Sequence, residues 1–236
     1  MAAMIDILEA SVPGSRSQSS FAYEAIRAAI LAGTHSPGTK LKIQDFAIDL
    51  KVSPGAVREA LSRLVPEQLV VSRDQRGFSV APLSIADLED LTDLRCEVEA
   101  IALRRSLAHG DIDWEAGVVA AAHRLQSAPL ALNPASVQTH AAFHTALVSA
   151  CGSRRLLALH AQLYEQSERY RGLSYRVEAK RNVQNEHRKI VDLALSRNVD
   201  GLIRAMVAHI RQTTALIAQA AQNQAMPTPA AAAPSR

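Results

Sequence analysis

The sequence predicts a mainly α-helical protein in two parts: an N-terminal unit of three helices and a β-hairpin, followed by an all-helical bundle of about six helices. Two observations support this prediction. Apolar residues recur at helical spacing through most of residues 21–67 and 84–221. Between these regions, Leu69–Ser72 and Gly77–Val80 are short apolar runs next to polar residues, which is typical of strands.

The first two helices are expected over residues 21–31 and 43–50. In the first, Ala22, Ile26 and Ile30 fall on one face, and the Pro37-Gly38 turn comes after the helix. In the second, Phe46 and its apolar neighbours repeat the pattern. Both helices should therefore pack one face against a small core.

The third helix is expected from Pro54 to about Glu67, because Ser53 is a favourable N-cap and proline is favoured at the first helical position. Arg58 and Arg63 are left on its outward side. The major groove of B-DNA admits one helix, and an arginine on that helix can donate two hydrogen bonds to guanine. An arginine on an amphipathic helix is more often only a solvated group, so neither residue alone indicates DNA binding.

The two strands are joined by the charged tip Arg73-Asp74-Gln75-Arg76. A hairpin directly after a short three-helix unit forms a wing, so the sequence predicts a winged helix-turn-helix over residues 17–81. Arg73 and Arg76 could contact phosphates or the minor groove, or they could be ordinary exposed charges of a hairpin. The sequence leaves both interpretations open.

A second domain is expected over residues 82–221. It begins where Ser84, followed by Asp87 three residues later, resembles a capping box. Helical periodicity then continues with five interruptions, which indicates a bundle of about six helices. The ends, residues 1–16 and 222–236, lack periodicity, and we expect them to be disordered.

Composition and charge limit the class of protein. Of 236 residues, 48% are hydrophobic, which is enough for two packed domains. The net charge of +3 permits contact with nucleic acid without requiring it. No uncharged stretch is long enough for a membrane span, and residues 1–10 lack the basic start of an export signal. Cys96 and Cys151 lie far apart without Cys-x-x-Cys spacing, so we expect a reducing, cytoplasmic environment.

A run of motifs in the first domain resembles the GntR family of bacterial transcription regulators. About sixty residues follow the family's order of helix, Pro-Gly turn, helix, recognition helix and glycine-tipped wing. The matching segments are Tyr23-Glu24-Ala25-Ile26, Pro37-Gly38-Thr39-Lys40-Leu41, Val52-Ser53, Val57-Arg58-Glu59-Ala60-Leu61-Ser62-Arg63-Leu64 and Gly77-Phe78-Ser79-Val80. The resemblance implies a DNA-binding regulator.

By this resemblance, Arg58 contacts DNA and Gly77 approaches the minor groove. Pro54 and Gly55 stand where many relatives have arginine and threonine, so one usual DNA-facing arginine is absent. Gln68 replaces the glycine that commonly ends the recognition helix, a strained choice if that position is left-handed. The expected DNA-binding residues are Ser53, Gly55, Arg58, Arg63, Arg73, Arg76 and Gly77.

Four histidines in the second domain are candidate metal ligands. His140 and His144 have i, i+4 spacing, which places both imidazoles on one helical face. His187 and His209 lie on two later helices, so three helices could converge on one point. For an arbitrary set of four histidines, surface or capped core residues are the commoner explanation.

The second domain resembles the effector domain of FadR-type regulators, called FCD. The matching segments are Leu94-Arg95, Glu99, Phe143-His144-Thr145-Ala146-Leu147, Glu186-His187 and Met206-Val207-Ala208-His209. Many members hold a divalent metal with one aspartate and three histidines, and His144, His187 and His209 fall on the histidine positions. His140 stands where the aspartate is expected, so the ligands would all be nitrogen unless water or a ligand carboxylate completes the site. Such a set suits zinc, with nickel or another transition metal as alternatives.

The same resemblance implies a small carboxylate effector near the metal. Arg95 is the expected carboxylate partner, although a surface arginine paired with Glu99 is equally compatible with the sequence. Arg169 and Arg171, on either side of Tyr170, are further candidates. The segments around Cys151 and Tyr170 resemble repressors of glutarate and carbon-starvation operons, which suggests a short, glutarate-like dicarboxylate.

Two other classes of function are compatible with parts of the sequence. A metal-dependent hydrolase needs a general base, but there is no His-Glu-x-x-His motif, and Glu186 is expected to point away around its helix. A winged-helix interaction protein that does not bind DNA is conceivable because the arginine at Pro54 is missing. We therefore expect no enzyme but a homodimeric repressor that reads an inverted repeat and is released by its ligand.

Overall fold

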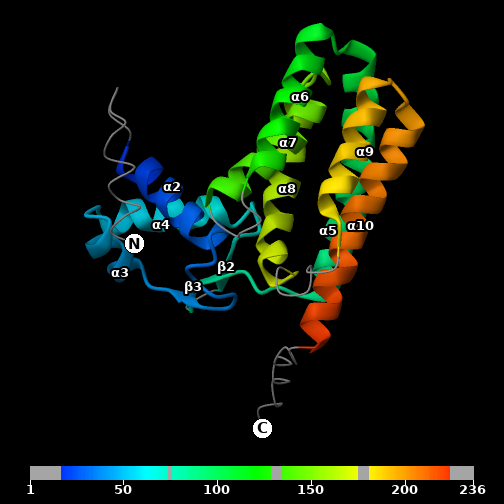
Figure 1. Cartoon of the computed structure of the whole chain (residues 1–236). Helices are drawn as coiled ribbons and strands as arrows, with labels where there is room; N and C mark the ends of the chain where they lie inside the picture. The colour runs from blue at the N-terminus through cyan, green and yellow to red at the C-terminus, as the bar shows by residue number, and fades with distance from the viewer. Residues whose placement is uncertain (1–16, 74–75, 129–133, 175–180, 224–236) are drawn as a thin grey trace. The chain divides into compact units, whose positions relative to one another are not determined.

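A computed structural model describes residues 17–73, 76–128, 134–174 and 181–223 (Figure 1). The chain divides into two compact units, Met1–Pro82 and Leu83–Arg236. The expected disorder of residues 1–16 and of 224–236 concerns positions outside the described residues, while residues 222 and 223 continue the last helix. Among the described residues, none of the helices combines the length and apolar character that a membrane crossing requires.

The first unit contains the three predicted helices. They are α2 (Gln18–Leu31), α3 (Ile43–Asp49) and α4 (Pro54–Leu64). The Ser53 hydroxyl accepts a hydrogen bond from the backbone N–H of Ala56 (3.2 Å), and Pro54 occupies the first turn, as the sequence predicted. The helices bury a common core that includes Ala22, Ile26, Val57, Ala60, Leu61 and Leu64, all at most 1% exposed.

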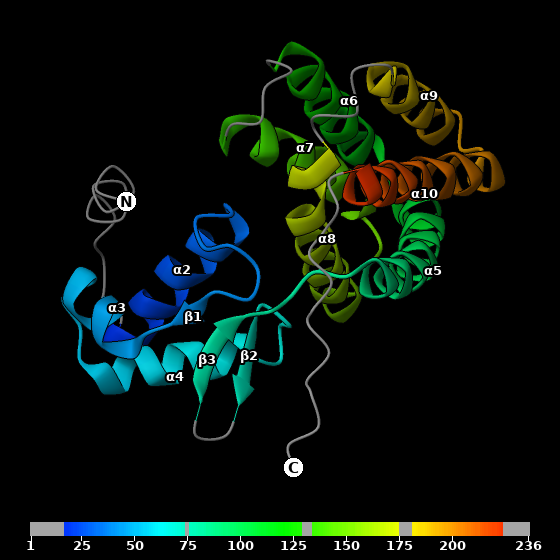
Figure 2. The ribbon, with the colours of Figure 1, turned by 90° about the horizontal axis from the view of Figure 1, so that it is seen from below.

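The wing is part of a three-stranded antiparallel sheet with the order β1-β3-β2 (Figure 2). The strands are β1 (Lys40–Leu41), β2 (Val70–Arg73) and β3 (Gly77–Val80). The hairpin β2–β3 was predicted, but β1 was not: Leu41 pairs with Phe78 across the sheet. Gln68, just before the hairpin, has φ 58°, so the residue that replaces glycine is left-handed, as the sequence suggested.

The second unit is a bundle of six helices within the described residues, which confirms the predicted fold class. Figure 1 shows these helices side by side. They are α5 (Ile85–His109), α6 (Ile112–Ser127), α7 (Pro134–Val148), α8 (Arg154–Ser174), α9 (Val183–Leu195) and α10 (Val199–Asn223). Ser84 caps α5 by accepting a hydrogen bond from the Asp87 N–H (3.1 Å). The core contains Phe143, Leu147, Ile190, Leu202 and Met206, each 0% exposed.

Candidate functional site

The outward face of α4 is the candidate DNA-binding surface. Gly55, Arg58 and Ser62 are exposed and follow one another at i, i+3 and i+7, so they share one side of the helix. The opposite side is buried. The Ser53 hydroxyl caps α4, and the Ser53 backbone N–H donates to the side chain of Gln18 (3.0 Å). Ser53 and Gly55 remain exposed at the start of this face. The structure therefore brings Ser53, Gly55 and Arg58 together on an accessible surface.

Arg63 lies on a different side of α4. Its guanidinium carbon is 4.2 Å from the centre of the Tyr23 ring on α2, a cation–π contact. The Tyr23 hydroxyl donates a hydrogen bond to Glu67, which also accepts one from Nε of Arg27 (2.8 Å). Arg63 is exposed, but it contributes to a contact between helices, and it does not join Arg58.

The wing presents a second group of expected DNA-binding residues. Arg73 ends β2 and pairs with Gly77 at the start of β3, and both are exposed. Arg76 is exposed as well, while residues 74–75 lie outside the described residues. Gly77 has φ 79°, a conformation that side-chain-bearing residues rarely adopt, and a Cβ there would meet no atom within 4 Å. Gly77 is therefore required by the backbone of the wing rather than by crowding.

In the second unit, the structure brings the four predicted histidines together. His140 and His144 come from α7, His187 from α9 and His209 from α10. Each offers one ring nitrogen, and these four nitrogens lie within 4.8 Å of one another. All four side chains are buried, from 0% exposed for His144 to 6% for His140 and His209. We call these residues the histidine cluster.

Burial keeps the histidine cluster uncharged. It lowers the pKa of His140 and His144 well below the ordinary value, and it lowers that of His187 to about 3. Among the described residues, Nδ1 of His144 and Nε2 of His187 are buried without a hydrogen-bond partner. Four neutral, closely spaced nitrogen donors, some of them unpartnered, fit a divalent transition metal.

Glu186 lies beside the histidine cluster, which corrects the expectation that it would point away. Its Oε2 is 2.8 Å from Nδ1 of His209 on the neighbouring helix. Arg181 donates to both oxygens of Glu186 and to the backbone oxygen of His209 (2.9 Å). Burial raises the pKa of Glu186, but the hydrogen bonds from His209 and Arg181 outweigh it and lower the pKa to about 2. Glu186 is thus an ionised partner of His209.

His140 has a different set of neighbours. Its Nδ1 is 2.7 Å from Nη1 of Arg171 and 2.5 Å from the Tyr164 hydroxyl, both on α8. Its Nε2 is 3.2 Å from Nε2 of His144. Arg171 also pairs with Glu168 (3.1 Å), which fixes the guanidinium in front of the imidazole.

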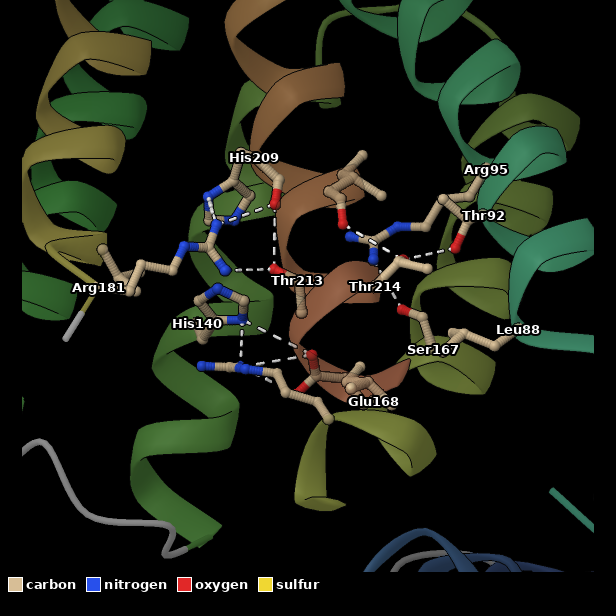
Figure 3. Close-up of a pocket in the computed structure, with 14 residues that line it drawn as sticks. Leu88, Thr92, Arg95, His140, Ser167, Glu168, Arg181, His209, Thr213 and Thr214 are labelled. Atoms are coloured by element: carbon tan, nitrogen blue, oxygen red, sulfur yellow. Dashed lines mark hydrogen bonds and ion pairs between the residues drawn. The ribbon is translucent and has the colours of Figure 1, made fainter. Parts of the chain in front are cut away.

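A cavity adjoins the histidine cluster (Figure 3). Figure 3 shows Arg95 across this cavity from His140 and Arg181. Its free space is about 30 Å³, which is room for about two water molecules. The polar part of its wall includes Arg95, Arg171, Arg181, Ser167, Thr213 and Thr214.

Arg95 is a buried cation of this cavity and is not the surface residue that the alternative interpretation required. It is 8% exposed, donates from Nη1 to Ser167 (2.7 Å) and stacks over the Tyr164 ring at 4.9 Å. Its Nε is buried and has no hydrogen-bond partner within the described ranges. Glu99 lies instead against His160, with 2.9 Å between Oε2 and Nε2. Arg95 thus has hydrogen-bonding capacity left for a ligand.

The other predicted arginines divide between two sides of α8. Arg171 lines the cavity, but Arg169 is not among the lining residues. The reason is helical spacing: Arg171 shares a face with Ser167 and Glu168, whereas Arg169, two residues earlier, faces away from them. Arg181 also lines the cavity, but no sequence pattern indicated this, because the residue precedes α9 in a stretch without periodicity.

Comparison with known proteins gives two family matches. Residues 18–80 match the model of bacterial regulatory proteins of the gntR family, and residues 90–212 match the FCD domain. Among curated proteins, the chain is 38% identical over 205 residues to the HTH-type transcriptional regulator BphR of Paraburkholderia xenovorans, with 84% of each chain covered.

Two further likenesses agree with these matches. The chain is 32% identical to the HTH-type transcriptional repressor GlaR of Escherichia coli, over 84% of this chain and 94% of that one. Among solved structures, E. coli McbR/YncC aligns with a TM-score of 0.72 at 18% identity, covering 87% of this chain and 99% of that chain. At such low identity, the last likeness shows the fold alone.

Proposed function

The chain belongs to the GntR family of bacterial transcriptional regulators and has an FCD effector domain, and from this premise we propose that a small carboxylate, bound beside a metal in the histidine cluster, controls its affinity for operator DNA. The family and the relatives are regulators and not enzymes. The observation that most supports a carboxylate is Arg95, a buried guanidinium with an unpartnered Nε at the wall of a cavity.

On the DNA side, α4 would enter the major groove with its exposed face toward the bases. Arg58 is the residue on that face that can donate two hydrogen bonds to guanine. The exposed residues Ser53 and Gly55 would lie close to phosphates at the start of the helix, where the helix dipole favours anions. Arg73, Arg76 and Gly77 would place the wing along the minor groove. A homodimer would present two such units to an inverted repeat.

Arg63 has a smaller part in this proposal. It is exposed, but its guanidinium already stacks on Tyr23. A phosphate contact from Arg63 would have to coexist with that stacking, which a planar guanidinium permits because its edge remains free. We assign it to backbone contact rather than to base recognition.

In the second unit, His144, His187 and His209 would hold a divalent metal, with His140 as the fourth residue of the cluster beside it. Zinc suits neutral imidazoles, and nickel is an alternative. When bound, the ion supplies a positive charge that attracts a carboxylate. The chain's own residues would complete recognition. Arg95 would bind a second carboxylate across the cavity, and the hydroxyls of Thr213 and Thr214 would form hydrogen bonds with the part of the ligand that lies between its two carboxylates.

The two ends of this site favour a short dicarboxylate such as glutarate. One carboxylate would lie at the histidine cluster and the other at Arg95, on the opposite side of the cavity (Figure 3). Because the free space of the cavity is about 30 Å³, we infer that a side chain of its wall, such as Arg171 or Arg181, moves when such a ligand enters. The ligand can relieve repression only if it binds the form with low DNA affinity more tightly than the other form.

A metal-dependent hydrolase is less well supported than a sensor. Within the described part of the chain, two carboxylates contact the cluster, and both are paired. Glu186 is bonded to His209 and Arg181, and Glu168, beside His140, is paired with Arg171, so neither is free to act as a base. A winged-helix protein that does not bind DNA is the other alternative. A titration with DNA at several salt concentrations distinguishes it, because the affinity of a true DNA complex falls steeply as the salt concentration rises.

The test combines metal analysis with ligand-dependent stability in the full chain. After purification without chelator, we expect about one metal ion per chain, and we expect glutarate to raise the melting temperature only when metal is present. Arg95→Gln should abolish the glutarate response, while Arg169→Gln, outside the cavity, should keep it. A glutarate response that survives in Arg95→Gln would refute the role of Arg95.

The same proteins test the link to DNA. A duplex selected by the chain from a random pool is titrated with and without glutarate and metal. Glutarate should weaken DNA binding by the metal-loaded chain and leave the Arg95→Gln variant unchanged. Equal DNA affinity with and without glutarate in the wild-type chain would mean that the carboxylate is not the effector.

A further inference from the structure

The four histidines of the cluster do not have equal chemical roles. A neutral imidazole carries one proton, so one ring nitrogen can donate a hydrogen bond and the other has a lone pair. Only the nitrogen with the lone pair can bind a metal. The hydrogen-bond partner of the nitrogen that faces away from the cluster decides where the proton lies. It therefore decides whether the nitrogen that faces the cluster has a lone pair.

For His209 that partner is a carboxylate. Glu186 can only accept a hydrogen bond, and its Oε2 lies 2.8 Å from Nδ1 of His209. Nη2 of Arg181 lies farther from this nitrogen, at 3.2 Å, and already donates to Glu186 and to the backbone oxygen of His209. The closer contact with the carboxylate therefore decides the state of Nδ1, which carries the proton. The lone pair is on Nε2, and His209 is prepared to act as a metal ligand.

For His140 the partner is a guanidinium. Arg171 has five N–H donors and no acceptor, and its Nη1 lies 2.7 Å from Nδ1 of His140. Nδ1 must therefore accept, and the proton is on Nε2. The Tyr164 hydroxyl, which also contacts Nδ1, can donate or accept, so it does not oppose this assignment. His140 thus directs an N–H group, and not a lone pair, into the cluster.

We propose that His144, His187 and His209 hold the metal, and that His140 donates a hydrogen bond from Nε2 to the group that occupies the fourth position. This inference rests on the metal site proposed above and specifies its open position. In the present structure Nε2 of His144, 3.2 Å away, accepts that hydrogen bond. When this nitrogen binds metal, the N–H of His140 needs another acceptor, which a carboxylate oxygen supplies.

The alternative is a closed site of four histidine ligands. The 3.2 Å separation of the two Nε2 atoms would suit ligands of one ion as well as a hydrogen bond. To bind metal, however, His140 would have to move its proton to Nδ1, which then faces the donors of Arg171. Glu168, whose Oε1 is 3.8 Å from Nδ1, could accept that proton only after Arg171 leaves. Arg171 is therefore the group that keeps the fourth position open.

The experiment uses Co²⁺ as a spectroscopic probe in the metal-stripped full chain and acetate as a probe anion. We expect the wild-type chain to bind Co²⁺ and acetate to change its visible absorption. His140→Gln should lower Co²⁺ affinity by at most about tenfold and weaken the acetate response, whereas the matched variant His144→Gln should lower Co²⁺ affinity by more than about 100-fold. Equal losses of Co²⁺ in the two variants would overturn the proposal.

A second variant tests the role of Arg171, whose side chain is 15% exposed and lies at the cavity wall rather than in the apolar core. In Arg171→Met, His140 is free to become a ligand. Co²⁺ binding should tighten, and acetate should no longer change the spectrum. An unchanged Co²⁺ affinity with a normal acetate response would show that Arg171 does not set the role of His140. A wild-type chain that binds no Co²⁺ at all would instead refute the metal site itself.

Discussion

The two candidate functional surfaces of this chain are constructed in opposite ways. On α4, Arg58 projects from an exposed face while the other face, with Val57 and Leu61, is buried and holds the helix. In the helical unit, the functional side chains are themselves buried: His144 is 0% exposed and His187 is 5%. A change on α4 should therefore alter DNA affinity without altering stability, while a change in the histidine cluster should alter both.

The largest effect that distinguishes the two units is the response to acid. The folded pKa of His187, about 3, lies below its unfolded value of about 6.5. As the pH falls below about 6.5, the unfolded chain binds protons that the folded chain cannot, so stability is lost until the folded pKa is reached. For His187 this loss is about 2 kcal/mol between pH 7 and pH 5, and the pKa values of His140, His144 and His209 are lowered in the same direction.

Hydrogen exchange measured by mass spectrometry on the metal-free chain checks this prediction. Protection of α7, α9 and α10 should fall between pH 7 and pH 5, after correction for the intrinsic exchange rates, while protection of α2 and α4 stays constant. His187→Gln should show a smaller pH dependence than the wild-type chain. Equal losses of protection in both units would contradict the assignment to buried histidines.

The next effect concerns the carboxylate behind His209. Glu186→Gln replaces an acceptor that fixes the proton on Nδ1 of His209, and we expect the affinity for Zn²⁺ to fall by about 10- to 100-fold. Competition with a chromophoric chelator measures this. Glu165→Gln on α8 is a control, because Glu165 is not among the residues of the cluster or the cavity wall. Unaltered Zn²⁺ affinity in Glu186→Gln would mean that Glu186 only anchors Arg181.

On the exposed surface, Arg58→Ala should weaken binding to the selected duplex by about tenfold, which is within the range for loss of a bidentate contact to guanine. Melting temperature and glutarate binding should not change. Arg63→Ala offers the opposite pattern, a smaller loss of DNA affinity together with lower stability, because it removes the stacking on Tyr23. Fluorescence anisotropy and thermal melting of the same samples separate the two residues. The α4 assignment fails if Arg58→Ala binds DNA normally.

The smallest expected effect is at Gln68, a non-glycine residue with φ 58°. Gln68→Gly relieves the left-handed strain, although glycine also gives the unfolded chain more freedom. We expect a net stabilisation of the first unit by roughly 0.5–1 kcal/mol. Unfolding in urea is monitored with a signal that comes from the first unit. A higher midpoint in Gln68→Gly would support this expectation, whereas a lower midpoint would refute the strain.

Elements that depend on neighbouring residues could be predicted from the sequence. Contacts between residues far apart in the sequence could not. Ser53 and Pro54 indicated the start of α4 because capping is local. The hairpin followed in the same way from the change to strand-like segments. By contrast, β1 exists only because Leu41 meets Phe78 across the sheet, and no pattern in two residues indicates that pairing.

In the histidine cluster, the residue types were predicted but their partners were not. The spacing of His140 and His144 placed them on one face, and the resemblance to the FCD family supplied His187 and His209. The contact between Glu186 and His209 depends on the packing of α9 against α10, which helical periodicity does not specify. The same limit explains why Arg181 was missed and why Arg169 was considered together with Arg171.

The small size of the cavity has a consequence for kinetics. The free space beside the histidine cluster is about 30 Å³, so we expect a dicarboxylate to bind only when a side chain of the cavity wall moves, and association to be slower than diffusion. The observed binding rate should level off at high ligand concentration, at the rate of that opening. The regulator would then respond to a sustained rise in its effector more than to a brief one.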